Sequence, residues 1–231
     1  MKKFFSLILA LALALSLAAC GGSGNAADDR SEQQPTGQTG SEQPEEQSEP
    51  EEVELHDTIV LSGSGDDVVD VDIPDGYYYV FHITGNAAGR HFAVTTYNSS
   101  NEYSELLVNT TEPYDGTTYD ASLDVRSIEV KSTGDWTIEV IDLAGWDWMS
   151  EGETRTGTGD AVFAISGGRT ADIEGNADGR HFAVISYDGY GEYDDLLVNT
   201  TEPYSGTVRL GNDATIITVN AASSWSFTLN G

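Results

Sequence analysis

The sequence predicts an all-β protein: two tandem β-sandwich domains of a jelly-roll-like type, which follow a signal peptide and a disordered acidic linker. The first observation is a duplication, because 23 of the 33 residues from 85 to 117 recur 90 positions later. The second is the spacing of short segments rich in β-branched and aromatic residues, which Gly, Asp, Asn and Pro interrupt at close intervals. No segment shows a helical period, and many short strands with regular turn signals are typical of sandwiches and jelly rolls.

Residues 1–19 have the pattern of a secretory signal peptide, with a cationic head followed by an apolar run. The run is shorter than the roughly 20 residues that a membrane-spanning helix needs. It ends in Leu-Ala-Ala-Cys20, which resembles the bacterial lipobox, and this resemblance implies that Cys20 carries a lipid. We therefore expect an exported protein anchored to the membrane at the outer face of the bacterial cytoplasmic membrane, in the cell envelope. The alternative is that Cys20 is an ordinary thiol near a cleavage site.

Residues 20–56 are predicted to form a disordered acidic tether. From position 21 to 56 the chain carries ten carboxylates and one arginine, with few apolar residues. Such a segment cannot bury enough surface to offset its conformational entropy, and its own charge extends it. Cys20 is the only cysteine, so internal disulfides cannot stabilise the domains, and folding must depend on hydrophobic cores.

The repeat divides the remaining chain into module one (57–142), a linker (143–153) and module two (154–231). In a strand that begins at the Arg90-His91 pair, Phe92 and Val94 share the core face, while His91 points the other way. The strands expected in module one are 58–61, 68–73, 77–83, 91–97, 105–108, 117–123, 127–130 and 136–141.

The order of motifs in each module also resembles a known type of domain. The elements are G-x-G-D-x-V, a Gly-rich turn, H-F-x-V, LLVN, Y-x-G-T and a terminal W-T-I-x-V. They look like a small β-sandwich module that is found in tandem in secreted and lipid-anchored proteins of Gram-positive bacteria. More loosely, they are similar to prepeptidase C-terminal and carbohydrate-binding sandwiches. This resemblance implies a fold and carries almost no catalytic information.

Arg90-His91 and its copy Arg180-His181 are candidate ligand-binding residues. Cations are scarce, since positions 57–231 hold 29 acidic residues against seven Lys and Arg. A cationic pair that is present in both modules would suit an anionic or sugar ligand. The structural interpretation, which we favour, is that Arg90 pairs with a carboxylate at the strand's entrance and that His91 is half exposed.

The second repeated string, Leu-Leu-Val-Asn-Thr-Thr-Glu-Pro-Tyr, is best explained by turn formation. Pro113 presets a turn, Gly116 can supply a positive φ, and the hydroxyl of Tyr114 can pin the loop in the manner of a tyrosine corner. The functional alternative makes Glu112 and Glu202 acid catalysts or metal ligands.

Acidic and aromatic residues supply the remaining candidates. Asp66, Asp67, Asp70 and Asp72 are weak candidates for a calcium site, although a solvated acidic strand face explains them better. For the aromatic residues, ligand binding competes with a role in joining the modules. The aromatic candidates are Tyr103, Trp146, Trp148 and Tyr193, whereas Trp136 and Trp225 are expected in the core.

The composition excludes several classes of function. A formal net charge of −29 excludes a nucleic-acid-binding footprint. No catalytic motif, metal site or phosphate loop is recognisable, and no cofactor is expected. We therefore expect a non-enzymatic binding protein with a glycan or surface-protein ligand; its oligomeric state stays open. The alternatives are a structural spacer without a specific ligand and an accessory domain of a hydrolase system. A hydrolase is a further option, which would need Glu102, Glu112 and Asp120, or their copies, to converge in a cleft.

Overall fold

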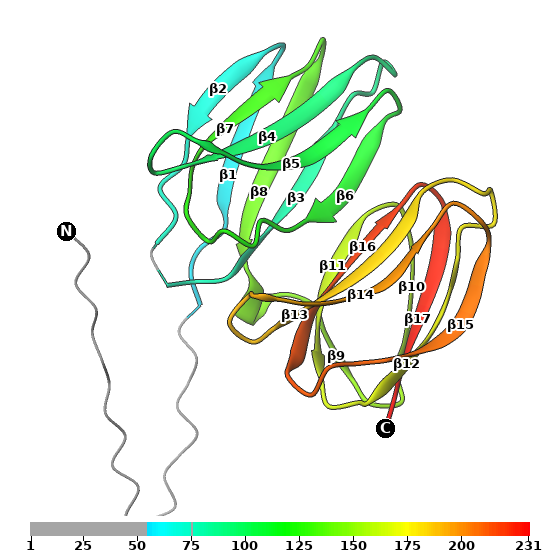
Figure 1. Ribbon diagram of the computed structural model, residues 1–231. Coiled ribbons are helices and arrows are strands. Elements are labelled where there is room, and N and C mark those ends of the chain that lie inside the picture. The colour runs from blue at the N-terminus through cyan, green and yellow to red at the C-terminus, as the bar shows by residue number, and fades with distance from the viewer. Residues whose placement is uncertain (1–54, 75) are drawn as a thin grey trace, which may run out of the picture. The chain divides into compact units, whose positions relative to one another are not determined.

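The computed structural model describes residues 55–74 and 76–231 (Figure 1). The predicted signal peptide, Cys20 and the tether up to residue 54 lie outside the described residues, so those expectations stay predictions. The described chain is built from strands with one short 3-10 helix, η1 (Leu143–Gly145), which confirms the all-β class. None of the helices in the described part is long and apolar enough to cross a membrane.

Residues 55–142 form two four-stranded sheets with the orders β1-β8-β3-β6 and β2-β7-β4-β5. The pairs β1·β8, β2·β7, β3·β6 and β4·β5 are all antiparallel. This nesting of strand pairs is the jelly-roll topology. The strands are β1 (Ile59–Ser64), β2 (Asp67–Asp70), β3 (Tyr79–Gly85), β4 (Phe92–Asn98), β5 (Tyr103–Thr110), β6 (Tyr114–Thr118), β7 (Val125–Lys131) and β8 (Asp135–Asp142).

The second half of the described chain repeats this plan, with the sheet orders β10-β17-β12-β15 and β14-β13-β16-β11-β9. The additional strand β9 (Trp148–Ser150) pairs in parallel with β11 and covers part of its edge. Figure 1 shows the first half in cyan to green and the second in yellow to red. The other strands are β10 (Thr154–Thr158), β11 (Ala161–Ser166), β12 (Thr170–Gly175), β13 (Phe182–Asp188), β14 (Tyr193–Thr200), β15 (Tyr204–Arg209), β16 (Ala214–Ala221) and β17 (Ser224–Asn230).

Alternation along the strands builds one core in each sandwich. Phe92 and Val94 are fully buried, as the strand parity predicted. Trp136 belongs to the first core and Trp225 to the second, also as expected. Trp136 lies against Gly63, where any Cβ would overlap the indole ring, and its Nε1 donates to the carbonyl of Gly65 at 3.0 Å. The Gly-x-Gly motif therefore makes room for the ring and accepts its hydrogen bond.

The sixth strand differs from the expectation. It spans Tyr114–Thr118 rather than 117–123, because the chain completes its turn before Pro113 and enters the sheet directly after it. Gly116 lies inside this strand, and its predicted use as a positive-φ turn residue is wrong. A Cβ at Gly116 would come within 3.0 Å of the Tyr114 hydroxyl and 3.1 Å of the Asp160 carbonyl. The glycine thus permits a close approach between the modules.

A third apolar cluster joins the two modules. Val80, Tyr119 and Leu143 from the first half pack with Val162 and Ile216 from the second. Around this cluster, the backbone N–H of Thr117 donates to the Asp160 carbonyl at 3.1 Å. The Thr117 hydroxyl oxygen in turn accepts from the N–H of Val162 at 2.8 Å. The modules therefore form a packed pair rather than separate beads.

Polar residues occupy some of the corresponding positions at the two free surfaces. Strand registers place Thr170 where module one has Val80, and Arg209 where it has Tyr119. On the opposite side, Ser127 of module one stands where module two has Ile216. The duplication thus preserved the fold, and some docking positions are polar on each free surface, whereas Val68, the counterpart of Val162, is apolar there.

Candidate ligand-binding face

The repeated Gly-Asn-x-x-Gly-Arg-His-Phe string forms a backbone clamp around a buried asparagine. Asn86 is 2% exposed and has a left-handed φ of 59°. Its Oδ1 accepts from the Arg90 N–H at 2.8 Å, and its Nδ2 donates to the carbonyls of Arg90 at 2.5 Å and Glu112 at 2.7 Å. Both repeated strings meet at this side chain, so the clamp explains why they recur together.

Asn176 repeats the clamp in module two, with φ of 61° and hydrogen bonds to Arg180 N–H at 2.7 Å and the Glu202 carbonyl at 2.9 Å. Sequence reasoning missed both asparagines. Their signal was present, because Asn after Gly in both copies is a residue that tolerates the left-handed region and bonds nearby backbone.

The side chains of the two Arg-His pairs are exposed at the start of β4 and β13. The expected ion pair of Arg90 with a carboxylate is wrong within the described part of the chain, where Arg90 contributes its backbone groups instead. The His181 ring lies 3.0 Å from Asn220 Oδ1. The strand register places Lys131 at the position of Asn220 in module one, so the end of the sheet near His91 carries an additional cation.

Several exposed apolar side chains of module one gather on the outer face of the sheet β2-β7-β4-β5, whereas Val60, 59% exposed, lies in β1 of the other sheet. The cross-strand registers align Tyr97 with Tyr103 and Thr95 with Leu106 on this face. Exposure is 60% for Tyr103, 40% for Leu106 and 62% for Val68. We call this surface the module-one face; its residues are Val68, Thr95, Tyr97, Tyr103, Leu106, Glu129 and Lys131.

A hydrogen-bonded chain of polar groups crosses the same face. The Tyr97 hydroxyl donates to one oxygen of Glu129 at 2.9 Å, and Lys131 Nζ lies 2.8 Å from the other. Hydrogen bonds from Lys131 and Tyr97 lower the pKa of Glu129, and those to Glu129 raise the pKa of both Tyr97 and Lys131. These contacts hold a carboxylate and an ammonium group in place beside an exposed aromatic ring.

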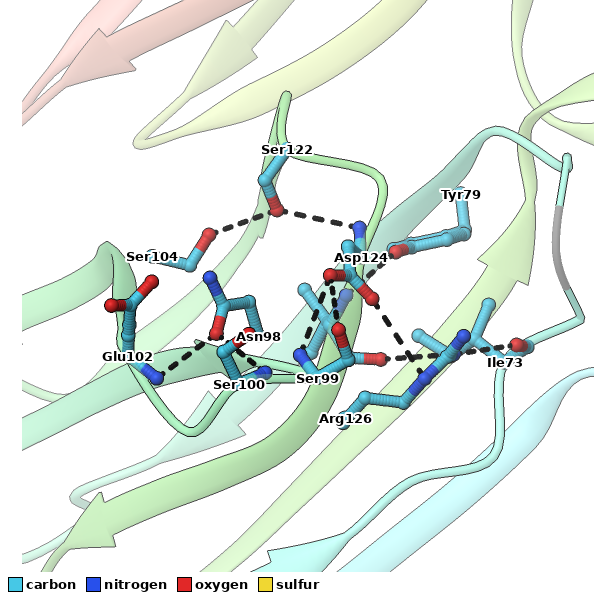
Figure 2. Close-up of polar contacts among 11 residues, drawn as sticks. Ile73, Tyr79, Asn98, Ser99, Ser100, Glu102, Ser104, Ser122, Asp124 and Arg126 are labelled. Atoms are coloured by element: carbon cyan, nitrogen blue, oxygen red, sulfur yellow. Dashed lines mark hydrogen bonds and ion pairs between the residues drawn. The ribbon is translucent and has the colours of Figure 1, made fainter. Parts of the chain in front are cut away.

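The hairpin before Tyr103 is fixed by side chain to backbone hydrogen bonds (Figure 2). Asn98 Oδ1 accepts from the N–H groups of Ser100 at 3.0 Å and Glu102 at 2.9 Å. Ser99 Oγ donates to Asp124 at 2.7 Å and ties the hairpin to the residue that precedes β7. Tyr103 therefore projects from a constrained turn, which reduces the entropy that its ring would lose on binding a ligand.

The corresponding face of module two is partly covered by module one. Tyr187, the counterpart of Tyr97, lies 5.1 Å from Tyr119 of module one between ring centroids. Farther along the same face, Tyr193 and Leu196 stay exposed at 61% and 42%. The structure therefore places the candidates Tyr103 and Tyr193 at equivalent edges. Of the module-one face, Leu106 also lines a hollow that it shares with Val162 and Tyr187 of module two.

The two linker tryptophans have different environments. Trp146 packs against the inter-module cluster, and its Nε1 donates to the Val162 carbonyl at 2.8 Å. Trp148 is 47% exposed and lies in β9, where it pairs with Ala164. Joining the modules and strand pairing, the alternatives to ligand binding, thus account for both residues.

The acidic candidates do not assemble into a site. Asp66 accepts from the N–H of Ser132 at 3.0 Å, and Asp67 from the N–H of Val68 at 2.8 Å. Asp70 and Asp72 are exposed. Within the described ranges, no three or more His, Cys, Asp and Glu side chains are grouped to hold a metal ion.

The carboxylates considered for hydrolysis are separated. Glu102 precedes β5 and Glu112 follows it, and eight residues of strand span roughly 26 Å. Asp120 is 1% exposed and accepts hydrogen bonds from Thr96 at 2.5 Å and Ser104 at 3.1 Å. Glu102 and Glu112 therefore cannot form the closely spaced pair that glycoside hydrolysis uses, and Asp120 is engaged in buried hydrogen bonds with Thr96 and Ser104.

Sequence reasoning also missed His82, which lies on the outer face of β3. Its Nδ1 is 2.8 Å from Glu139 and its Nε2 is 2.9 Å from Asp115. Burial of the ring acts to lower the pKa of His82, but the hydrogen bonds to these carboxylates outweigh it, and the pKa is raised. The three residues come from adjacent strands and are far apart in the sequence, so no local motif predicts that they meet.

No family model and no curated protein matches the chain. Among solved structures, the tandem CBM51 modules of a family 98 glycoside hydrolase from Streptococcus pneumoniae are similar over 77% of this chain and 85% of theirs. The sequence identity is 7% and the TM-score is 0.23. The fold assignment therefore depends on the strand pairing within this chain.

Proposed function

We propose that the protein is a lipid-anchored, non-enzymatic binding protein of the bacterial cell surface, and that the module-one face binds a saccharide. Cys20 anchors it to the outer face of the cytoplasmic membrane, and the acidic tether displays the two packed modules. The observation that carries the proposal is the exposed Tyr103 ring beside the ordered Tyr97–Glu129–Lys131 chain.

The chemistry of this face suits a sugar. The C–H face of a pyranose packs on an exposed aromatic ring, and its hydroxyl groups bond to fixed carboxylate and ammonium groups. Leu106 and Val68 extend the apolar contact. Because Glu129 and Lys131 already have their geometry fixed by each other and by Tyr97, little ordering is needed when the ligand binds.

A glycan array and cell-wall polysaccharide pull-downs with the detergent-solubilised full chain test the proposal. We expect saturable binding to at least one saccharide and a loss of about tenfold or more in the Tyr103→Ala variant. The matched control is Tyr190→Ala, because Tyr190 is 77% exposed but lies in the β13–β14 hairpin. Equal binding by wild type and Tyr103→Ala would refute the assignment of the face, and the absence of any saturable ligand would favour a structural spacer.

The membrane anchor is tested separately through Cys20. The Cys20→Ser variant should leave the membrane fraction and lack the mass of the lipid. A variant that stays in the membrane fraction, together with a wild-type protein that carries no acyl mass, would contradict lipid anchoring.

A further inference from the structure

Two arginines that form no ion pair with any described residue line one hollow of module two. Three of the seven Lys and Arg residues between 57 and 231 form ion pairs with carboxylates, namely Arg126, Lys131 and Arg155. Among the described residues, Arg169 and Arg209 have no such partner, and both line one open hollow of about 990 Å³. This pairing of free cations is the feature that the proposed function does not use.

Strand pairing and backbone hydrogen bonds around the hollow fix the backbone positions of both arginines. Arg209 ends β15 and stands opposite Thr170 of β12. The N–H of Arg169 donates to the Asn230 carbonyl at 2.7 Å, and the carbonyl of Arg169 accepts from Leu210 at 2.9 Å. Both side chains are therefore attached to backbone positions that are held by hydrogen bonds on one rim, and both residues are exposed.

A need for solubility does not explain these cations. The end of module one that corresponds to this surface is apolar because it docks on module two, so the free end of module two needed polar residues. Elsewhere the chain meets that need mainly with acids, which outnumber Lys and Arg by 29 to seven between 57 and 231. Arg169 and Arg209 line the same hollow as one acidic side chain, Glu151, so the cationic side chains outnumber the acidic one there and a ligand that supplies negative charge is favoured.

We infer that this hollow binds a sugar that carries an oxyanion, either a carboxylate or a phosphate. The planar guanidinium fork matches both groups through paired N–H···O hydrogen bonds. Glu151 also lines the hollow, and its carboxylate lies beside Gly231 and within 3.9 Å of a Cβ built on Gly167. It repels a simple anion and accepts from a hydroxyl group, so it favours a ligand with both an oxyanion and hydroxyl donors. This site goes beyond the proposed function and shares no residue with the module-one face.

Saturation-transfer NMR and titration with the full chain in detergent test this inference with three probes: glucuronate, glucose 6-phosphate and glucose. We expect at least one of the two anionic sugars to bind and glucose not to bind, with binding weakened by high salt. The Arg169→Gln and Arg209→Gln substitutions should each lower the affinity roughly tenfold, because each removes a charge-assisted hydrogen bond. The matched control is Arg180→Gln, since Arg180 is exposed and lies outside the hollow.

The outcomes separate the possibilities. Binding of glucuronate alone assigns a carboxylate ligand, and binding of glucose 6-phosphate alone assigns a phosphate ligand. The inference is overturned if neither anionic sugar binds, if glucose binds as well as they do, or if the double arginine variant binds unchanged. Because Tyr103→Ala should leave this binding intact, failure here and failure of the proposed function give different results.

Discussion

The buried clamp of Asn86 predicts a large loss of stability from a small substitution. Asn86→Ala removes three hydrogen bonds to the backbone of Arg90 and Glu112, each contributing about 1 kcal/mol. It also places alanine at φ 59°, which costs about 1 kcal/mol more. We therefore expect the free energy of unfolding to fall by about 4 kcal/mol, measured by guanidinium denaturation of the full chain with tryptophan fluorescence.

Two further variants separate the contributions. Asn86→Gly loses the same hydrogen bonds without the backbone strain, so it should lose about 3 kcal/mol. Asn176→Ala removes the two described hydrogen bonds of the second clamp and should also lose about 3 kcal/mol, strain included. A loss below about 1 kcal/mol for Asn86→Ala, or a glycine variant less stable than the alanine variant, would refute this account of the clamp.

Three other predictions follow from single contacts. The pKa of His82 is raised in the folded protein. Its contribution to stability is therefore fully present below the unfolded-state pKa and is lost as pH rises through the folded-state pKa. Thermal melts across these pH values should show a falling melting temperature from this group in wild type and not in His82→Gln. Tyr114→Phe removes a 2.8 Å hydrogen bond to Asp160 across the module interface and should cost about 1–2 kcal/mol. Tyr204→Phe has no such bond among the described residues and should be near neutral in the same denaturation assay; equal losses would contradict the interface. Gly157→Ala pushes a methyl group into the Trp225 ring and should cost about 1–3 kcal/mol, whereas an unchanged melting temperature would show that the ring moves aside freely.

Strand parity and turn chemistry predicted most of the fold, because both are local. The burial of Phe92, Val94 and Trp136 follows from alternation, and the doubling of the module follows from the repeat itself. The position of β6 was missed by three residues at its start, since Pro113 was assigned to the beginning of the turn although it directly precedes the strand. The hydroxyl of Tyr114 was expected to pin its own loop and instead reaches Asp160 in the other module.

The candidate site was less predictable, because its residues meet only through strand pairing. Tyr103 is recognisable as an exposed aromatic residue, yet its neighbours lie on two other strands, Tyr97 on β4 and Glu129 and Lys131 on β7, and nothing in their spacing groups them. The same holds for Arg169 and Arg209, which are 40 residues apart in the sequence and converge through the β12·β15 ladder. The role of Asn86 was readable in principle from the repeated Gly-Asn pair.

The polar residues at the free surfaces disfavour the packing of a third module against the existing pair. A third module, gained by unequal crossing-over within the gene, would present Thr170 and Arg209, or their copies, where the existing junction needs Val80 and Tyr119. Such a module would fold but would not pack against its neighbour, because the surface on which it would dock is polar. Lengthening the protein by rigid units would therefore require point mutations at the free surface that carries Thr170 and Arg209, whereas lengthening the predicted acidic tether would require only insertions.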